Sequence, residues 1–268
     1  RRRTMGHNHV EVALTLGKLG SRYLVLGETE KAKSMLNRAL RTLETHFGHD
    51  HYQVGPILNN LAVCHSDLGE IHSAKEVLER ALKVKEAHYG SNHVEISTTL
   101  NNLANRHADL GDLLTAANML RRALAIKEAH YGFNHVEIAS TLNNLAMCYM
   151  SLGDGETSQR MFERALLMKE AHFGSSHLEV ASSLSNLAIL LKTLGKVGES
   201  KELLERAVAI EEKHYGRQHS AIALTLIRLA NLTSDVGEIR AATSLLERAL
   251  EIQEVHHGKN SVEVACVR

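Results

Sequence analysis

The feature that most constrains the fold of this chain is an internal repeat with a period of 42 residues. The hexapeptide Thr-Leu-Asn-Asn-Leu-Ala at 99–104 returns at 141–146, and related segments stand at 57–62 and 183–188. Glycines keep the same interval in two columns, which are Gly27, Gly69, Gly111, Gly153, Gly195 and Gly237, and Gly6, Gly48, Gly90, Gly132, Gly174, Gly216 and Gly258. A period of this length predicts a stack of equivalent units that share one continuous core.

Each period is predicted to hold two helices joined by a tight turn at the first glycine column. In the third period, apolar side chains follow the three-and-four spacing of one helical face. They include Ile96, Leu100, Leu103 and Leu110. Proline occurs once in the chain, at Pro56, so the segments between the glycines are otherwise free of helix breakers. We expect the helices of this period near residues 94–109 and 112–130.

The period divides the chain into six full repeats and part of a seventh. The full repeats are 6–47, 48–89, 90–131, 132–173, 174–215 and 216–257, and the partial repeat is 258–268. We expect one solenoid over residues 1–268. Because neither end shows a polar capping helix, we also expect the chain to be a fragment of a longer protein.

Composition narrows the classes of partner. Lys plus Arg equals Asp plus Glu, at 31 each, so no overall charge attracts nucleic acid or anionic lipid. No apolar run reaches the roughly 20 residues that a membrane helix needs. Cys64 and Cys148 hold equivalent positions two repeats apart, about 20 Å in stacked helices, which is too far for a disulfide. We expect a soluble, cytoplasmic protein that binds neither nucleic acid nor membrane.

Charged residues four apart are expected to pair along solvated helix faces. Examples are Glu76 with Arg80 and Glu202 with Arg206, each pair stabilising its helix by a few tenths of a kcal/mol.

The pattern Leu-x-x-Leu-Ala-x-x-x-x-x-Leu-Gly, followed by Ala and then Leu-x-Arg-Ala-Leu, resembles the tetratricopeptide repeat. The 42-residue form, with Lys-Glu-Ala-His-Tyr-Gly-Ser-Asn-His-Val-Glu-Ile at 85–96, is similar to the repeats of kinesin light chains and nephrocystin-3-like proteins. The resemblance implies an all-α fold, an α-solenoid of about six helix-turn-helix repeats plus a truncated seventh, wound as a right-handed superhelix. It also implies a concave groove, lined by the first helices, that holds an extended peptide.

Asparagines in the middle of the first helices are the sharpest candidate site. The residue before the Leu-Ala pair is Asn60, Asn102, Asn144 and Asn186 in four successive repeats, and tetratricopeptide arrays that bind peptides often hold Asn there. A carboxamide offers both an acceptor and donors, so it can pair with a peptide bond without reading its sequence. The alternative is that these amides bond to the neighbouring repeat and set its twist.

Further residues are expected to line the same groove. They are Asn59, Asn101, Asn143, Asn105, Met147, Met150, Ile189, Lys192 and Arg228. Lys18 and Arg228 occupy the asparagine position at the two ends of the array, where they either meet acidic groups of a ligand or are simply solvated.

The chain contains 18 histidines, a number that raises the possibility of a metal site. Their spacing argues against one. Twelve form two columns, one ending second helices (His46, His88, His130, His172, His214 and His256) and one opening first helices (His9, His51, His93, His135, His177 and His219). Equivalent residues in adjacent layers stand about 10 Å apart, whereas zinc needs each nitrogen within about 2.1 Å. His46, His49 and His51 make the one three-ligand cluster. For the histidine columns we expect capping and packing roles, and we expect no metal.

The sequence offers no pattern typical of an enzyme. It has no glycine-rich phosphate loop, no Cys-x-x-Cys pair and no nucleophile in a strand-to-helix turn. We therefore predict a non-catalytic, monomeric scaffold without a cofactor that binds a protein or peptide partner. Two alternatives stay open, namely self-association as a structural spacer and a regulatory segment attached to a catalytic domain elsewhere.

Overall fold

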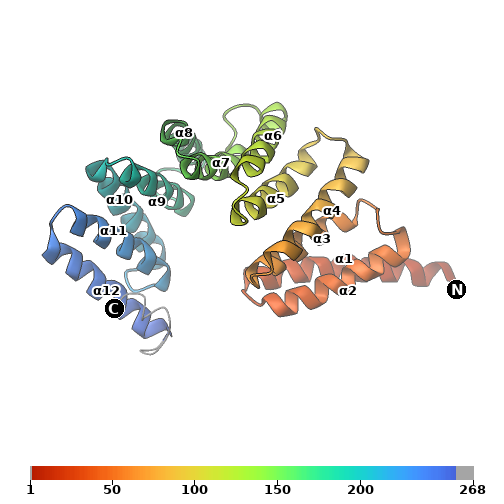
Figure 1. The fold of residues 1–268 in the computed structure, drawn as a ribbon. Helices are drawn as coiled ribbons and strands as arrows, with labels where there is room; N and C mark the ends of the chain where they lie inside the picture. Colours follow the sequence, from red (N-terminus) through yellow and green to blue (C-terminus); the bar gives the residue numbers. More distant parts are fainter. Residues whose placement is uncertain (1, 258–268) are drawn as a thin grey trace. The chain divides into compact units, whose positions relative to one another are not determined.

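The computed structural model describes residues 2–257, and the expected partial repeat at 258–268 lies outside them (Figure 1). Twelve α-helices and three short 3₁₀ segments make up the regular structure of this part of the chain, which contains no strand. The fold is therefore an all-α solenoid, as the repeat period predicts.

The described residues form two compact units, which divide between Phe133 and Asn134. The first contains α1 (Arg2–Val25), α2 (Thr29–Phe47), α3 (Val54–Asp67), α4 (Ile71–Tyr89), η1 (Val94–Ile96), α5 (Ser97–Asp109) and α6 (Leu113–Tyr131). The second contains η2 (Val136–Ile138), α7 (Ala139–Ser151), α8 (Gly155–Phe173), α9 (Leu178–Thr193), α10 (Val197–Tyr215), η3 (Ser220–Ile222), α11 (Ala223–Asp235) and α12 (Ile239–His257).

Each predicted repeat corresponds to one helix pair. In the third repeat the first helix ends at the expected residue, and its expected start is a 3₁₀ turn, η1, that leads into α5. The first repeat differs from the others, because α1 begins at Arg2 and runs through Gly6 and His9. The prediction of a turn at Gly6, with His9 opening the helix, is therefore wrong.

The tight turn inside each repeat depends on a glycine in a left-handed conformation. Gly111 has φ of 83°, which residues with a side chain rarely adopt. Its N–H donates to the carbonyl of Ala108, and the next N–H, of Asp112, donates to the carbonyl of His107. These bonds satisfy carbonyls that the end of a helix otherwise leaves open, so the glycine column fixes where each first helix stops.

Small residues let the two helices of a repeat approach closely. Ala62 and Ala104 on first helices and Ala39 and Ala81 on second helices are buried. Leucines fill the space between them, and Phe162 is the bulkiest fully buried side chain. A larger residue in either alanine column would overpack the core, which typically costs about 1 to 3 kcal/mol.

Arginines on the second helices pair with carboxylates of the preceding repeat. The expected pairing of these arginines with a glutamate four residues earlier on the same helix is therefore wrong. Arg80 Nη2 lies 2.6 Å from Glu44 Oε1 and donates to the carbonyl of His49 at 2.7 Å. Arg206 makes the equivalent bonds to Glu170 and to the carbonyl of Ser175. Each guanidinium thus joins a carboxylate of the preceding repeat and a carbonyl of the connecting loop to the second helix of its own repeat, an arrangement that suits its planar set of donors.

Candidate functional site

The two adjacent asparagine columns have different environments. Asn59, Asn101 and Asn143, the inner column, are buried, with only 7 to 8% of their surface exposed. Asn59 Nδ2 donates to Thr99 Oγ1 at 3.0 Å, and Asn143 Nδ2 lies 3.5 Å from Ser183 Oγ. The expectation that this column lines an open groove is wrong, because these amides are enclosed between consecutive first helices.

The outer column behaves differently. Its members, Asn60, Asn102, Asn144 and Asn186, are partly exposed. Within the described part of the chain, none of these four carboxamides makes a hydrogen bond to another residue. They therefore keep both a donor and an acceptor free for a ligand.

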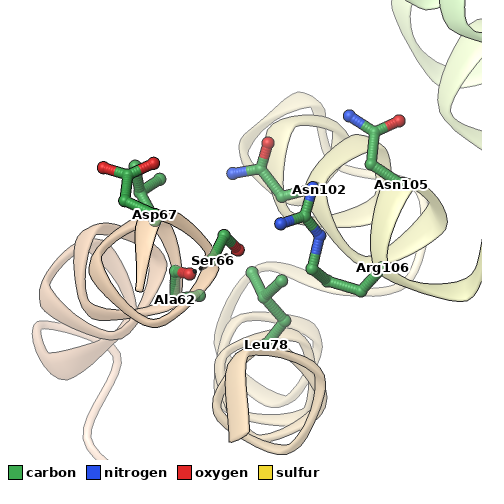
Figure 2. Close-up of a pocket in the computed structure, with 8 residues that line it drawn as sticks. Ala62, Ser66, Asp67, Leu78, Asn102, Asn105 and Arg106 are labelled. Carbon is green, nitrogen blue, oxygen red and sulfur yellow. Dashed lines mark hydrogen bonds between the residues drawn. The ribbon is translucent and has the colours of Figure 1, made fainter. Parts of the chain in front are cut away.

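A hollow of about 170 Å³ lies between α3 and α5 beside the outer column (Figure 2). Asn102 and Arg106 of α5 lie opposite Ser66 of α3, and the other lining residues are Asn105, Asp67, Ala62, Val63 and Leu78. Arg106 is held by an ion pair of 3.1 Å to Asp109. Two predicted site residues, Asn102 and Asn105, thus meet at one polar hollow.

A second and more apolar hollow, of about 330 Å³, lies between α1 and α3 and includes Asn60. Its lining is Leu14, Gly17, Lys18, Ser21, Tyr52, Gln53, Pro56, Ile57, Asn60, Lys85, Tyr89 and Glu95. Lys85 is almost completely buried, and its Nζ donates to the carbonyl of Glu95 at 3.1 Å. Burial lowers the pKa of the Lys85 ammonium, an effect that the negative charge of Glu95 partly opposes.

The predicted site residues of the second unit are only partly available. Met147 is 38% exposed, and Met150 and Ile189 are partly exposed. Lys192 Nζ lies 2.7 Å from Asp235 Oδ2, so this ammonium already has a carboxylate partner.

Arg228 also has a neighbouring acid. Burial raises the pKa of the Glu211 carboxyl, and the charge of Arg228 acts in the opposite direction by favouring its ionised form. Lys192 is therefore held by an ion pair within the second unit, whereas Arg228 acts on Glu211 only through its charge.

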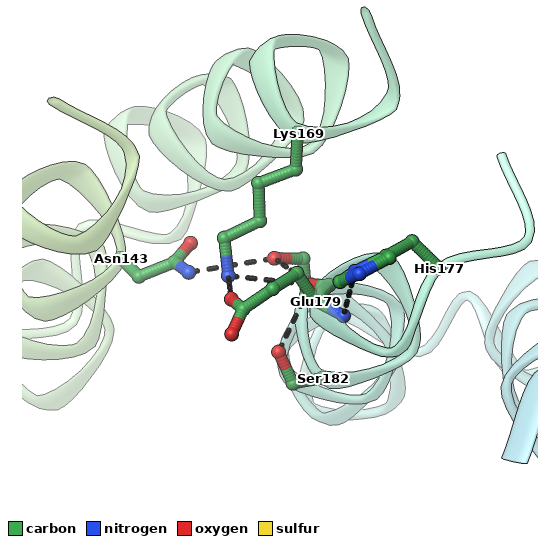
Figure 3. A network of polar contacts seen from close by, with 6 residues as sticks. Asn143, Lys169, His177, Glu179 and Ser182 are labelled. Atoms are coloured by element: carbon green, nitrogen blue, oxygen red, sulfur yellow. Dashed lines mark hydrogen bonds and ion pairs between the residues drawn. The ribbon is translucent and has the colours of Figure 1, made fainter. Parts of the chain in front are cut away.

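A polar network around α9 shows how side chains that recur with the 42-residue period hold neighbouring helices together (Figure 3). Lys169 Nζ donates to both the carbonyl and the carboxylate of Glu179, at 3.2 and 2.8 Å. His177 Nδ1 accepts the N–H of Glu179 and so caps α9. Ser182 Oγ donates to the carbonyl of Glu179 at 3.0 Å. These residues serve the joint between α8 and α9 rather than a ligand.

The histidine columns act as caps and as ring contacts. His93 and His219, like His177, accept a backbone N–H at the start of a helical segment. In the first turn of repeat 2, the ring of Phe47 stacks on His51 and meets the edge of His46. His49 instead faces Glu44 at 3.2 Å. Among residues 2–257, no three His, Cys, Asp or Glu side chains gather as a metal site requires.

The sequence matches family models described as tetratricopeptide repeat over residues 23–87, 53–129, 137–213 and 222–263. The chain belongs to the tetratricopeptide repeat family. A search of curated proteins found no match. None of the described helices of this tetratricopeptide repeat protein combines the length and apolar character that a membrane crossing requires.

Solved structures of tetratricopeptide repeat proteins share the fold at low sequence identity. BtubC (BKLC) from P. vanneervenii is 22% identical, with a TM-score of 0.71 over 87% of this chain and 94% of that one. The nearly identical TPR-like repeats of a Podosopora anserina putative kinesin light chain are also 22% identical, with a TM-score of 0.64 over 77% and 97%. The APC/C hetero-tetramer Cut9–Hcn1 is 16% identical, with a TM-score of 0.69 over 99% and 44%.

Several residues around the two hollows were not singled out from the sequence. Lys85 is one of them, and it is buried in the wall of the apolar hollow. Gly17 and Ile57 line the same hollow and depart from the columns that hold Asn at positions 59, 101 and 143 and Thr or Ser at positions 99, 141, 183 and 225. That break in the tetratricopeptide columns is the sequence signal that points to the hollow.

Proposed function

We propose that this tetratricopeptide repeat protein is a non-catalytic scaffold that binds an extended segment of a partner protein along its first helices. The outer column supplies amides for the main chain of the segment, and Met147, Met150 and Ile189 contact its apolar side chains. The similarity in fold to the repeats of a putative kinesin light chain supports an adaptor role of the same general kind.

One observation carries this proposal. On three successive first helices, one asparagine is buried while the next residue, also asparagine, is partly exposed and its side chain makes no bond to any of residues 2–257. Asparagine is a mediocre helix former, so an exposed and unbonded asparagine in mid-helix gives the fold nothing. Within each unit, such amides on successive first helices suit the alternating N–H and C=O groups of an extended peptide.

The proposal places the protein in the cytoplasm. Cys64 and Cys148 are buried free thiols, and such thiols persist in a reducing compartment.

Photo-crosslinking tests the proposed surface. Met147, on α7, is replaced by p-benzoylphenylalanine, and the full chain is irradiated in lysate and analysed by mass spectrometry. The matched control carries the same group at Leu114 on the second helix α6, which is 66% exposed. We expect crosslinks from position 147 to one short segment of a partner. Equal crosslinking from both positions, or none from position 147, would contradict the proposal.

A further inference from the structure

Among the described residues, the junction between the first two repeats lacks the polar tie that two later junctions have between their first helices. Asn59 bonds to Thr99 between repeats 2 and 3, and Asn143 lies within reach of Ser183 between repeats 4 and 5. One period earlier than Asn59 and Thr99, the same two positions hold Gly17 and Ile57. The first junction therefore has no amide side chain between its first helices.

The apolar hollow lies at this junction. A Cβ added at Gly17 would come within 2.5 Å of Ile57 Cδ1, so the isoleucine occupies the place that a longer residue at position 17 would need. Leu14, Pro56 and the ring of Tyr52 complete the apolar wall around Ile57. The free volume of about 330 Å³ is large enough for one bulky side chain.

Polar groups at this hollow lack partners. Gln53 Oε1 is buried without a hydrogen-bond donor. Lys18 holds in repeat 1 the position that Asn60 holds in repeat 2. Neither the ammonium of Lys18 nor the carboxamide of Asn60 makes a bond or ion pair within the described residues. A buried acceptor without a donor costs about 1 to 3 kcal/mol, so a ligand that supplies an N–H at Gln53 is favoured.

The charges around the hollow limit what it accepts. Two ammonium groups, of Lys18 and Lys85, face one carboxylate, of Glu95. The surplus positive charge disfavours a basic side chain, and the apolar wall disfavours any side chain that brings an unpaired polar group.

We propose that this hollow is the specificity-determining subsite of the peptide surface, and that it takes one uncharged aliphatic or aromatic side chain of the extended segment. The main-chain N–H of that residue supplies the donor that Gln53 lacks, and Asn60 binds the adjacent peptide bond. This inference rests on the proposed function, and it sets the register in which a partner segment lies on α1 and α3.

Model peptide units test the subsite without knowledge of the partner. N-acetyl-leucine-N′-methylamide, the corresponding glycine compound and the corresponding lysine compound are titrated into the full chain, observed by methyl NMR. We expect the leucine compound to shift the methyl signals of Leu14 and Ile57 in a saturable way at millimolar concentration. The glycine and lysine compounds should bind at least 10-fold more weakly. Equal binding of the three compounds would overturn the proposal.

A double variant provides the matched control. Gly17→Asn with Ile57→Thr introduces the residues found at the junction of repeats 2 and 3, so it should fold and keep or raise Tm, while it replaces the isoleucine of the apolar wall by polar groups. Binding of the leucine compound, read at Leu14, should fall at least 10-fold. A folded double variant that binds the compound as tightly as the natural chain would contradict the subsite. If the double variant does not fold, the preference of the natural chain among the three compounds still decides.

The two proposals fail separately. Leucine binding without crosslinks from position 147 would retain the subsite and remove the partner segment. Crosslinks without a preference for leucine would retain the peptide surface and remove this subsite.

Discussion

At the scale of single residues, Asn59 and Asn60 are neighbours with opposite environments. The side chains of consecutive helical residues point about 100° apart, so one helix can direct one amide to the next repeat and the other to solvent. Asn59 is enclosed by Thr99 of the following repeat, whereas Asn60 borders the apolar hollow. The pattern of one helix cannot tell the two asparagines apart. Asn59 is buried by a residue of another repeat, and that contact is not visible in the pattern.

Glu211 is a residue whose charge the fold disfavours. Burial raises the pKa of its carboxyl, Thr225 Oγ1 donates to Oε1 at 3.1 Å, and Oε2 is buried without a partner. A raised pKa means that the folded state holds the proton more tightly than the unfolded state. The free energy of unfolding therefore falls as pH rises from the usual carboxyl range through the raised value.

We accordingly predict that Glu211→Gln stabilises the protein at pH 7 to 8. The amide removes the buried charge, and the equivalent position in the next repeat already holds Gln253. Tm should rise by about 2 to 4 °C, the shift expected for about 1 kcal/mol. The gain should shrink as pH is lowered toward 4, where the carboxyl is protonated in both states. Calorimetry at pH 4 and pH 7.5 measures this, and a lower Tm for the variant at pH 7.5 would refute it.

Cys64 is predicted to be inert in the folded protein. It is fully buried, and burial raises the pKa of its thiol to about 11. In a Cys266→Ser background, a maleimide at pH 7.5 should modify Cys64 at least about 100-fold more slowly than it modifies free cysteine, since thiolate is the reactive form. Labelling should become rapid in denaturant. Rapid labelling under native conditions would show that the helices of repeat 2 open more readily than their packing implies.

At the scale of helices, the arginine contacts between repeats replace the pairing that sequence spacing suggests. Arg80→Ala should lower Tm by about 2 to 4 °C, because it removes the guanidinium that bonds both to Glu44 and to the carbonyl of His49. Glu76→Ala, which removes the residue four positions away, is the control and should change Tm by less than 1 °C. Equal losses from the two variants, measured by thermal denaturation, would support the original pairing along α4.

The helices and turns of this chain follow from its sequence, but the site follows only in part. Glycines such as Gly111 mark the turns, and the apolar spacing of Leu100 and Leu103 marks the helix faces, because both act within one helix pair. The ion pair of Lys192 with Asp235 joins two repeats, so its formation depends on how those repeats stack. The hollow at Gly17 likewise depends on Ile57 of the next repeat.

At the scale of the whole molecule, the open question is whether the chain acts alone or with copies of itself. We predict a monomer of 29.6 kDa by light scattering, at concentrations up to about 100 μM. This result would leave the outer asparagine column free for another protein. A mass that rises with concentration, and falls when Asn102 and Asn144 are both replaced by alanine, would instead assign these residues to self-association.

The most direct measurement compares the two asparagine columns in the same protein, by Tm and by affinity for the segment that crosslinking identifies. Asn102→Ala with Asn144→Ala should change Tm by less than about 2 °C, because alanine is the better helix former, and should weaken binding at least 10-fold. Asn59→Ala with Asn143→Ala should lower Tm by several degrees through lost buried hydrogen bonds, with the affinity of the folded protein unchanged. If the outer pair proves to stabilise the fold and the inner pair to bind the segment, the account is wrong.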